Sequence, residues 1–536
     1  MKRRRFLIGA GVAALFTRIP NVVAQSNHRK VSVADFLDRF GETDAAIQGA
    51  IDQAIRSGAS VVLLPALHGG RAYEVRRTIQ NNGVQLVGDG PGSIVRKIGR
   101  GSCFVSGYVP STNIARITTE IAAGTDRIKD SACAGIELRA GAVYVLTSEG
   151  RCHPNTPAHC GEFVVVKAAS NGIALLERPL LYSYRPTEDA CVRDAGLVGG
   201  VGYRELRIEM DPAVVPTSAL TRFDNYGIQL DFCRSPLVRG VSISDGVAAG
   251  VRLLGCIDAR IVDYRASDLG SAEDDQNGSS TIGPGGYGYG IAERGLNRGL
   301  VVERAVTDQV RHLYTSGAEW PDVFKYGMPI DSLITNSTSK NAKGACFDTH
   351  ETGINITFEN CHAEGGRAVG FQLRSKNAKV VSCTARNLAG AAVWVYGADV
   401  HSNAAGDGCL VSGLQCDNVN GAPPTVYSAD VDWRDTGAIL DQGFGNEFRS
   451  VRVEDCAGPA LTVAAAARGG IYRDFDVSKV CQSTLAKCCV IDVEQISAEA
   501  APRISGIHVS DSPRVKAVMS ISNENCRPEV SDIVLS

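Results

Sequence analysis

A short pattern of apolar and polar residues recurs along the second half of this chain. It reads, in order, GIQLD from Gly227, GVRLL from Gly250, FDTH from Phe347, FQLR from Phe371 and VWVY from Val393. After most of these segments a second apolar run follows, and four such runs end at Cys361, Cys383, Cys416 and Cys456. The first two cysteines are separated by about the length of one solenoid coil. Because such repeats bury a core only by stacking on one another, the pattern predicts an all-β, right-handed parallel β-helix with these cysteines at equivalent inward positions.

Strand alternation assigns a direction to the polar residues of this repeat. Successive side chains of a strand point to opposite faces. Phe347 and Thr349 should therefore share the inner face, and Asp348 and His350 the outer one. In FQLR the same rule sends Arg374 outward.

The N-terminus has the features of an export signal. A basic cluster that includes Arg3-Arg4-Arg5-Phe6-Leu7 precedes a short apolar run and the small-residue segment Val22-Val23-Ala24. Arg18 interrupts the run well before the roughly 18 residues that a membrane anchor needs. Residues 1–24 are thus expected to be a signal peptide resembling the twin-arginine type, and the mature chain to be periplasmic or secreted.

The net charge and the glycine and cysteine content of the chain limit the classes of protein to which it can belong. The formal net charge is -3 over 536 residues, which argues against a nucleic-acid-binding protein. The 58 glycines favour a turn-rich β protein. The 17 cysteines cannot all pair within the chain, and their recurrence at one coil position favours buried free thiols over a disulfide framework. Paired CxxC spacing is missing, so no metal site is expected from them.

Residues 31–110 carry a family resemblance. Asp35-Phe36, a segment from Glu42 to Asp52, and Val61-Val62-Leu63-Leu64-Pro65-Ala66 are similar to the entrance of the pectate-lyase-like superfamily, in which a short amphipathic helix closes the first coil. The helix can also be read from its own residues. Thr43 is a suitable N-cap, Gly58 a stop, and apolar residues recur between them at Ala46, Ile47, Ala50, Ile51, Ala54 and Ile55. An open solenoid end exposes strand edges, so a cap is expected here.

The coil rhythm is lost in residues 111–185, where antiparallel strands and turns predict a small β-rich insertion. Its loop RCHPNTPAHC brings together Cys152, His153, His159 and Cys160. A disulfide that closes the hairpin loop is the plainer interpretation, with zinc as the alternative.

Coils resume near Val198 and are expected to continue through 198–536. The glycine-rich segment that starts at Ser271 is expected to be a loop that helps to build the binding site. Its residues Glu273, Asp274 and Asp275 offer Ca²⁺ as an alternative to a solvated acidic loop, and no other cofactor is expected. Tyr287 and Tyr289 are candidates for stacking on sugar rings.

Two motifs on adjacent coils extend the resemblance toward function. Arg311-His312, followed by Thr315-Ser316-Gly317, and Phe347-Asp348-Thr349-His350-Glu351 resemble motifs of β-helix polysaccharide depolymerases, which include bacterial lyases and phage tailspike-like proteins. The resemblance implies carbohydrate chemistry in a groove along one face of the helix. It leaves the sugar, the linkage and a homo-oligomeric state open.

The residue types favour an elimination reaction. A lyase acting on a uronic acid needs a base and a cation that neutralises the substrate carboxylate. His350 or His312 can be the base, Asp348 can orient it, and Arg311 and Arg374 can hold the carboxylate. Further substrate contacts are expected from Glu351, Tyr314, Trp394, Tyr396 and Tyr289. We therefore expect a polysaccharide lyase whose substrate is anionic.

A hydrolase, epimerase-like chemistry and a non-catalytic helix remain as alternatives at this point. A glycoside hydrolase would need paired carboxylates, which Asp348 together with Glu293 or Glu351 could provide. A non-catalytic carbohydrate-binding helix would use the same outward residues as a surface ladder.

Overall fold

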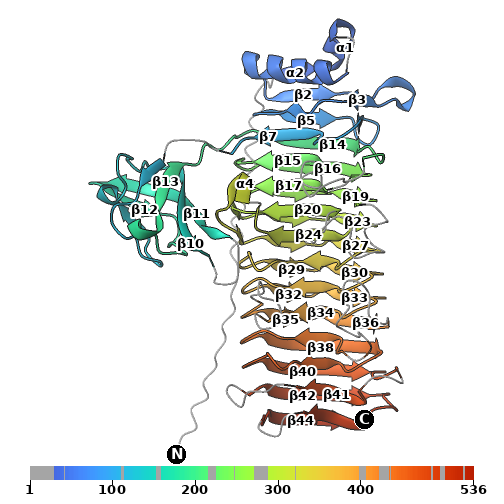
Figure 1. The fold of residues 1–536 in the computed structure, drawn as a ribbon. Helices are drawn as coiled ribbons and strands as arrows, with labels where there is room; N and C mark the ends of the chain where they lie inside the picture. The colour runs from blue at the N-terminus through green and yellow to red at the C-terminus, as the bar shows by residue number, and fades with distance from the viewer. Residues whose placement is uncertain are drawn as a thin grey trace, which may run out of the picture.

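The chain is a tall stack of β-coils with one lateral insertion (Figure 1). The computed structural model describes residues 29–40, 43–109, 114–152, 158–214, 225–246, 248–270, 288–319, 321–397, 406–421, 434, 436–483, 487–494, 501–522 and 526–536. The predicted export signal at 1–24 and the acidic residues 273–275 lie outside the described residues, as does Tyr287. No described helix is long and apolar enough to span a bilayer.

Two parallel sheets form the walls of the stack. Sheet A has 23 strands and sheet B has 13 among the described residues. The strands of sheet B are β4 (Ile79–Gln80), β7 (Phe104–Gly107), β15 (Tyr226–Asp231), β17 (Ala249–Leu254), β20 (Tyr289–Arg294), β24 (His312–Gly317), β28 (Phe347–Asp348), β31 (Phe371–Leu373), β34 (Val393–Val395), β37 (Ile439–Asp441), β39 (Leu461–Val463), β41 (Cys489–Val493) and β43 (Ala517–Ile521). Each of the segments from GIQLD to VWVY lies in this one sheet, as the repeat predicts.

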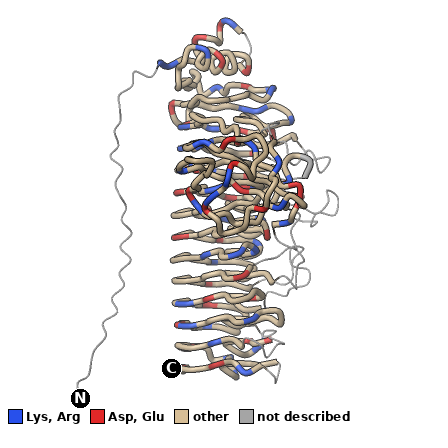
Figure 2. Tube along the Cα trace, turned by 90° about the vertical axis from the view of Figure 1, so that its left-hand side faces the viewer, with Lys and Arg blue, Asp and Glu red and all other residues tan. Residues whose placement is uncertain are grey.

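Sheet A folds around a corner and so supplies two faces of the helix. Its strands are β1 (Lys30–Ser32), β2 (Val61–Leu64), β3 (Tyr73–Val75), β5 (Gln85–Gly88), β6 (Ile94–Lys97), β14 (Gly202–Glu209), β16 (Leu237–Ser244), β18 (Arg260–Val262), β19 (Arg265–Ser267), β22 (Val301–Glu303), β23 (Val306–Asp308), β26 (Leu333–Thr335), β27 (Thr338–Lys340), β29 (Thr357–Glu359), β30 (His362–Glu364), β32 (Lys379–Val381), β33 (Thr384–Arg386), β35 (Leu410–Ser412), β36 (Gln415–Val419), β38 (Glu447–Cys456), β40 (Ile471–Ser478), β42 (Arg503–Ser510) and β44 (Glu529–Leu535). Basic and acidic residues are interspersed along the coils (Figure 2).

The corner of sheet A is a column of residues in the left-handed region. From β14 onward each coil turns there at one residue with φ between 50° and 68°. Glycine and the short polar residues Asp, Asn and Ser adopt this conformation most readily, and they occupy most of the column. Its members are Glu205, Gly240, Asp263, Arg304, Asn336, Asn360, Ser382, Gly413, Ser450, Asp474, Gly506 and Asp532.

The interior follows the predicted alternation. Phe347 and Phe371 point inward and stack at 4.9 Å between ring centroids. The four predicted cysteines are all buried, but only Cys361 and Cys383 occupy equivalent positions. Cys416 pairs with Ala385, two residues past the position of Cys383, so the prediction of one continuous cysteine ladder is wrong. All 17 cysteines are free thiols.

The N-terminal end is closed by helices, as expected. α2 (Thr43–Ser57) buries Ala46, Ile47, Ala50, Ile51 and Ala54 over the first coil, and Gly58 ends it with φ of 68°. Ile55, which was expected on the buried face, is 46% exposed. A further helix, α1 (Ala34–Phe40), precedes it.

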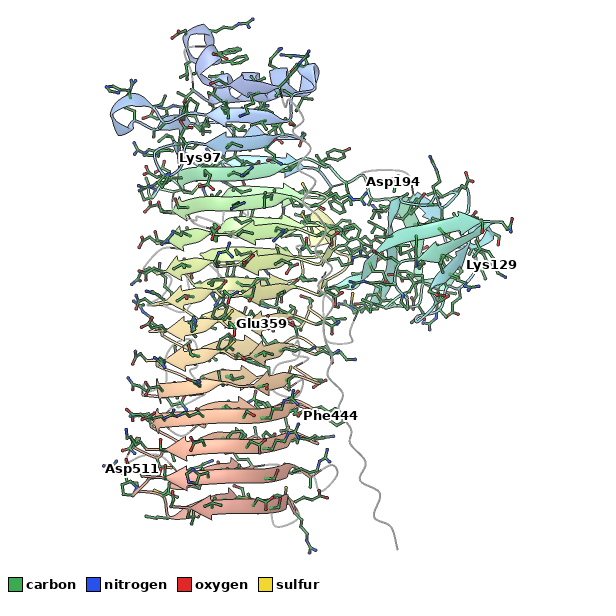
Figure 3. The ribbon with its side chains drawn as sticks, turned by 180° about the vertical axis from the view of Figure 1, so that it is seen from behind. Lys97, Lys129, Asp194, Glu359, Phe444 and Asp511 are labelled. Atoms are coloured by element: carbon green, nitrogen blue, oxygen red, sulfur yellow. The ribbon has the colours of Figure 1, made fainter. Side chains whose placement is uncertain are left out.

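The insertion is a six-stranded antiparallel sheet with its own core. Its strands are β8 (Ile114–Arg116), β9 (Arg127–Lys129), β10 (Val143–Arg151), β11 (His159–Ser170), β12 (Ile173–Leu176) and β13 (Cys191–Asp194). It therefore ends at Asp194 rather than at the predicted residue 185. Figure 3 shows Asp194 beside the helix and Lys129 at the far edge. The prediction of a disulfide between Cys152 and Cys160 is wrong. Both thiols are free, and the Cys152 thiol donates to the His159 carbonyl.

Two short elements join the insertion to the helix. α4 (Pro321–Phe324) follows β24, and β21 (Asn297–Arg298) pairs with β25 (Pro329–Ile330). His159 exchanges backbone hydrogen bonds with Lys325 and Gly327. Phe163 of the insertion packs in one cluster with Phe232 and Phe324, so the insertion is attached by both hydrogen bonds and apolar packing.

Two carboxyl groups point into the interior of the helix. Glu293 accepts hydrogen bonds from the Tyr314 hydroxyl at 2.5 Å and from the Ser332 hydroxyl at 2.8 Å. Asp441 accepts one from Tyr472 at 2.6 Å. Burial raises the pKa of Glu293 to about 7 and that of Asp441 to about 6. Both groups therefore favour the neutral acid more strongly in the folded chain than in the unfolded one.

Glu293→Gln should remove part of the pH dependence of stability. In the wild type, the unfolded chain ionises this residue above about pH 4.3 while the folded chain stays protonated until about pH 7. Stability should therefore fall as pH rises through this window, by on the order of 3 kcal/mol from this group. Urea unfolding at pH 4 and pH 8 measures the loss, with the surface variant Glu303→Gln as control. An unchanged pH dependence in Glu293→Gln would contradict this assignment.

Candidate functional site

Asp348 is the centre of the polar cluster on the outer face of sheet B. β28 pairs with β24 so that Asp348 lies beside Thr315, whose hydroxyl donates to it at 2.8 Å. Arg374 Nη2 donates to the other carboxylate oxygen, Oδ1, at 2.7 Å, and His350 Nε2 lies 3.2 Å from Oδ2, the oxygen that Thr315 contacts. The side chain is fully buried. Although burial opposes ionisation, Arg374 and then His350 and His312 hold the pKa of Asp348 well below its ordinary value, so the group is a carboxylate at neutral pH.

His350 lies between two carboxylates. Its Nε2 faces Asp348, and its Nδ1 is 3.6 Å from Glu351 Oε2, beyond normal hydrogen-bond length. Its backbone is fixed on both sides, because its N–H donates to the Ser316 hydroxyl and its carbonyl accepts from the Ser375 hydroxyl. The His350 side chain is 29% exposed. The side chains of His312, Asp348 and Arg374 are less exposed.

Glu351 is nearly buried, with its side chain 9% exposed. Burial raises its pKa, but His350 and Arg374 outweigh this and the net pKa is lowered. Both carboxyls that face His350 are therefore held as carboxylates.

His312 belongs to the same cluster but is a poor base. Its Nδ1 lies 2.5 Å from the Ala345 carbonyl and so carries the proton, while Nε2 accepts from Arg311 Nε at 3.3 Å. Nε2 is 3.8 Å from Asp348. Burial, reinforced by Arg311 and only partly offset by Asp348, lowers the pKa of His312 to about 3. The neutral ring stacks on Tyr289 at 5.5 Å, which fits a positioning role better than that of a base.

Arg374 is held in place while part of its side chain stays accessible. Its Nε donates to the Thr349 carbonyl at 2.9 Å, and the guanidinium lies over the Tyr396 ring at 5.5 Å. The side chain is 21% exposed. The five residues that the sequence assigns to one groove, Arg311, His312, Asp348, His350 and Arg374, are thus connected by direct contacts.

Several other expected residues face elsewhere. Tyr314 and Glu293 lie in the interior and hydrogen-bond to each other, so the predictions of Tyr314 as a sugar contact and of Glu293 as a hydrolase carboxylate are wrong. Trp394 and Tyr396 stack at 4.0 Å but are only 4% and 6% exposed, so little of either ring is accessible for the expected sugar contact. Tyr289 is also mostly buried, at 6% exposure.

A second ionic cluster on the same face was missed from the sequence. Arg252 of β17 forms ion pairs with Asp231 and Glu319, and all three are buried. The sequence feature that could have revealed this cluster is Arg252, an arginine in the middle of the apolar strand GVRLL. Since Glu319 lies at the start of the connection from β24 toward the insertion, the cluster anchors this connection against sheet B. Among the described residues, no group of three or more His, Cys, Asp or Glu is arranged to hold a metal ion.

Solved structures of tailspikes share this architecture. The tailspike gp49 of Pseudomonas phage LKA1 superimposes with a TM-score of 0.59 at 19% identity, over 91% of this chain and 81% of that one. The tailspike gp61 of Pseudomonas phage phi297 gives 0.56 at 15% identity, over 92% and 80%. The chain has the right-handed β-helix fold of phage tailspikes. No protein-family model matches it.

Two further proteins similar to this chain are described in connection with a bacterial capsule. The Gp54 tailspike of Acinetobacter baumannii bacteriophage AP22, solved with a capsular saccharide, gives a TM-score of 0.52 at 10% identity, over 94% of this chain and 79% of that one. A capsule K1-specific depolymerase of Klebsiella phage K64-1 is 36% identical over 94 residues. That match spans 18% of this chain and 10% of the phage protein.

Asp348→Asn should destabilise the fold. It leaves the largely buried Arg374 without its carboxylate, and breaking a buried pair in this way costs about 3 kcal/mol. Because the folded pKa of Asp348 is depressed, this contribution is complete at pH values above about 4 and is lost as pH falls through the folded pKa. Urea unfolding at pH 7 and pH 3 tests both statements, with the exposed Asp476→Asn as control. Equal stability of variant and wild type at pH 7 would show that the cluster is not stabilising.

Proposed function

We propose that this chain is an exported polysaccharide depolymerase that cleaves an anionic, uronic-acid-containing substrate by β-elimination on the outer face of sheet B. The observation that carries the proposal is the position of His350. Its side chain is partly exposed and contacts Asp348 through Nε2 only. The fold of the tailspikes and the local similarity to a capsule depolymerase support polysaccharide as the substrate class. The proposed location is periplasmic or secreted, on the basis of the N-terminal sequence.

The geometry suggests how elimination would proceed. For elimination we assign the proton of the neutral His350 ring to Nε2, which lies 3.2 Å from Asp348 and 3.1 Å from Arg374 Nη2, so that the Nδ1 lone pair is the base. Nδ1 takes the proton on the carbon next to the substrate carboxylate, that electron pair forms a C=C bond, and the bond to the leaving glycosidic oxygen breaks. The departing oxygen takes a proton from solvent. Glu351 lies 3.6 Å from Nδ1 and stabilises the imidazolium that forms.

The arginines supply the positive charge that the reaction needs. Removal of the proton places negative charge on the substrate carboxylate, and preorganised donors stabilise such charge strongly in a site with little water. Arg374 lies within 3.1 Å of His350, and Arg311 reaches the same cluster through His312. We propose that these two guanidinium groups face the carboxylate of the reacting sugar.

A paired-carboxylate hydrolase is the second candidate, because Asp348 and Glu351 flank His350. A hydrolase needs one carboxyl group with a raised pKa to protonate the leaving oxygen. The pKa values of both groups are lowered, whereas Glu293, whose pKa is raised, points into the core. These directions favour elimination.

His350→Ala should reduce turnover by about 10²-fold or more with the fold intact, since it removes the base. The measurement is mass spectrometry of products from a panel of acidic polysaccharides, in which elimination gives unsaturated ends. His362→Ala is the matched control, because His362 is exposed on β30 of sheet A, a different sheet from the one that carries the cluster.

Other outcomes would replace the proposal. Saturated products, with activity lost in Glu351→Gln and kept in His350→Ala, would establish the hydrolase. Binding of a saccharide without any cleavage would establish a non-catalytic carbohydrate-binding helix.

A further inference from the structure

Arg294 extends the cluster along sheet B. It lies on β20, and its guanidinium is positioned over the Tyr289 ring at 5.2 Å. Tyr289 in turn stacks on His312 at 5.5 Å with an interplanar angle of 21°. The three side chains form one layered unit, in which the mostly buried Tyr289 ring fixes both the arginine and the histidine.

Gly317 provides the space for this guanidinium. Arg294 pairs with Gly317 on the next coil, and a Cβ on Gly317 would lie too close to Arg294 Nη1 for both to remain in place. The backbone of Gly317 is not in the left-handed region, so its conformation does not require glycine. What the glycine provides here is the absence of a side chain under the guanidinium.

Arg294 has no anionic partner among the described residues. Arg252 and Arg374 on the same sheet face each bind a carboxylate, but no ion pair or hydrogen bond joins the Arg294 side chain to any described residue. Stacking occupies the flat face of a guanidinium and leaves the N–H donors at its edge. Those donors match a carboxylate in a bidentate arrangement.

The strand register relates this arginine to the proposed base. Thr315 pairs with Asp348 in the last pair of β28, and continuing that register by two residues sets Gly317 alongside His350. The hydrogen bond from the His350 N–H to Ser316 supports this alignment. Arg294, Gly317 and His350 thus follow one another over successive coils, with the backbones of Arg294 and His350 roughly 10 Å apart at about 4.8 Å per coil.

We propose that Arg294, held over Gly317 by Tyr289, binds the carboxylate of the sugar next to the one that reacts at His350. This inference rests on the proposed function and deepens it, since it requires a substrate with carboxylates on neighbouring sugars. Arg294 is then a binding residue, and its loss should affect affinity rather than the chemical step.

The test compares full-length wild type with Arg294→Gln and Gly317→Ala. The probes are oligosaccharides of polygalacturonate and alginate, which carry a carboxylate on every sugar, each also in a carboxyl-reduced form. Arg294→Gln should raise Kd and KM for the preferred acidic oligosaccharide by about 10-fold or more, the size expected for a charged hydrogen bond, with kcat nearly unchanged. Gly317→Ala should have the same effect because it displaces the guanidinium. Arg265→Gln on sheet A, an exposed arginine of another face, should change nothing.

The carboxyl-reduced probes separate charge from shape. Wild type and Arg294→Gln should bind them equally weakly, and circular dichroism should show that both variants are folded. If Arg294→Gln or a folded Gly317→Ala binds the acidic probe as tightly as wild type does, the inference is overturned while cleavage by the wild type still supports the proposed function. If wild type neither binds nor cleaves any acidic probe, both are overturned.

Discussion

The hydrogen-bonded register between successive coils is the constraint on which the rest of this structure depends. Parallel strands hold each residue directly above its counterpart one coil away, and a slip of one residue would turn every side chain to the opposite face. In sheet B this register keeps Phe347 and Phe371 inside, and it brings Thr315, Asp348 and Gln372 into one outward column. Residues far apart in the sequence can cooperate here because the backbone, not the side chains, sets their spacing.

The left-handed corners maintain that register from coil to coil. Each corner residue ends one strand at the same point of the coil. Its backbone N–H donates to a carbonyl of the next coil, as from Asn336 to Glu359 and from Asn360 to Val381. Short polar side chains suit such positions because they tolerate a positive φ. A buried carboxylate such as Asp348 needs a framework of this kind, since its ionisation depends on partners that come from three coils.

The sequence was sufficient for the fold and for the membership of the central cluster. Alternation placed Asp348, His350 and Arg374 on one face, and adjacency in the repeat placed Arg311 and His312 one coil away. Alternation failed at β24, where the consecutive residues Leu313 and Tyr314 are both in the core. Such a local irregularity cannot be predicted from the sequence, so Tyr314 was assigned to the outer face of the strand although it lies in the core.

The remaining errors have related causes. Trp394 and Tyr396 fit a surface pattern but are covered by a small apolar cluster with Leu440 and Ala464, which are distant in sequence. Cys416 appeared to continue a ladder because it too ends an apolar run, but that run carries its cysteine two residues past the position of Cys383. Glu293 is an acidic residue at an inward position, and only its contacts with Tyr314 and Ser332 explain how it is accommodated.

The position of the insertion has a consequence for the order of folding. β14 stacks directly on β5 and β6, so the coil that begins at Gly202 must find its place on Gln85 across a long chain segment. Closing a loop costs more entropy as the flexible segment lengthens, and non-local parallel pairing is slow for this reason. The insertion joins its ends early if its antiparallel sheet forms first, because β8 and β13 are neighbouring strands that lie at its entry and its exit. A segment that interrupts the solenoid in sequence can therefore act as the clamp that lets the solenoid resume.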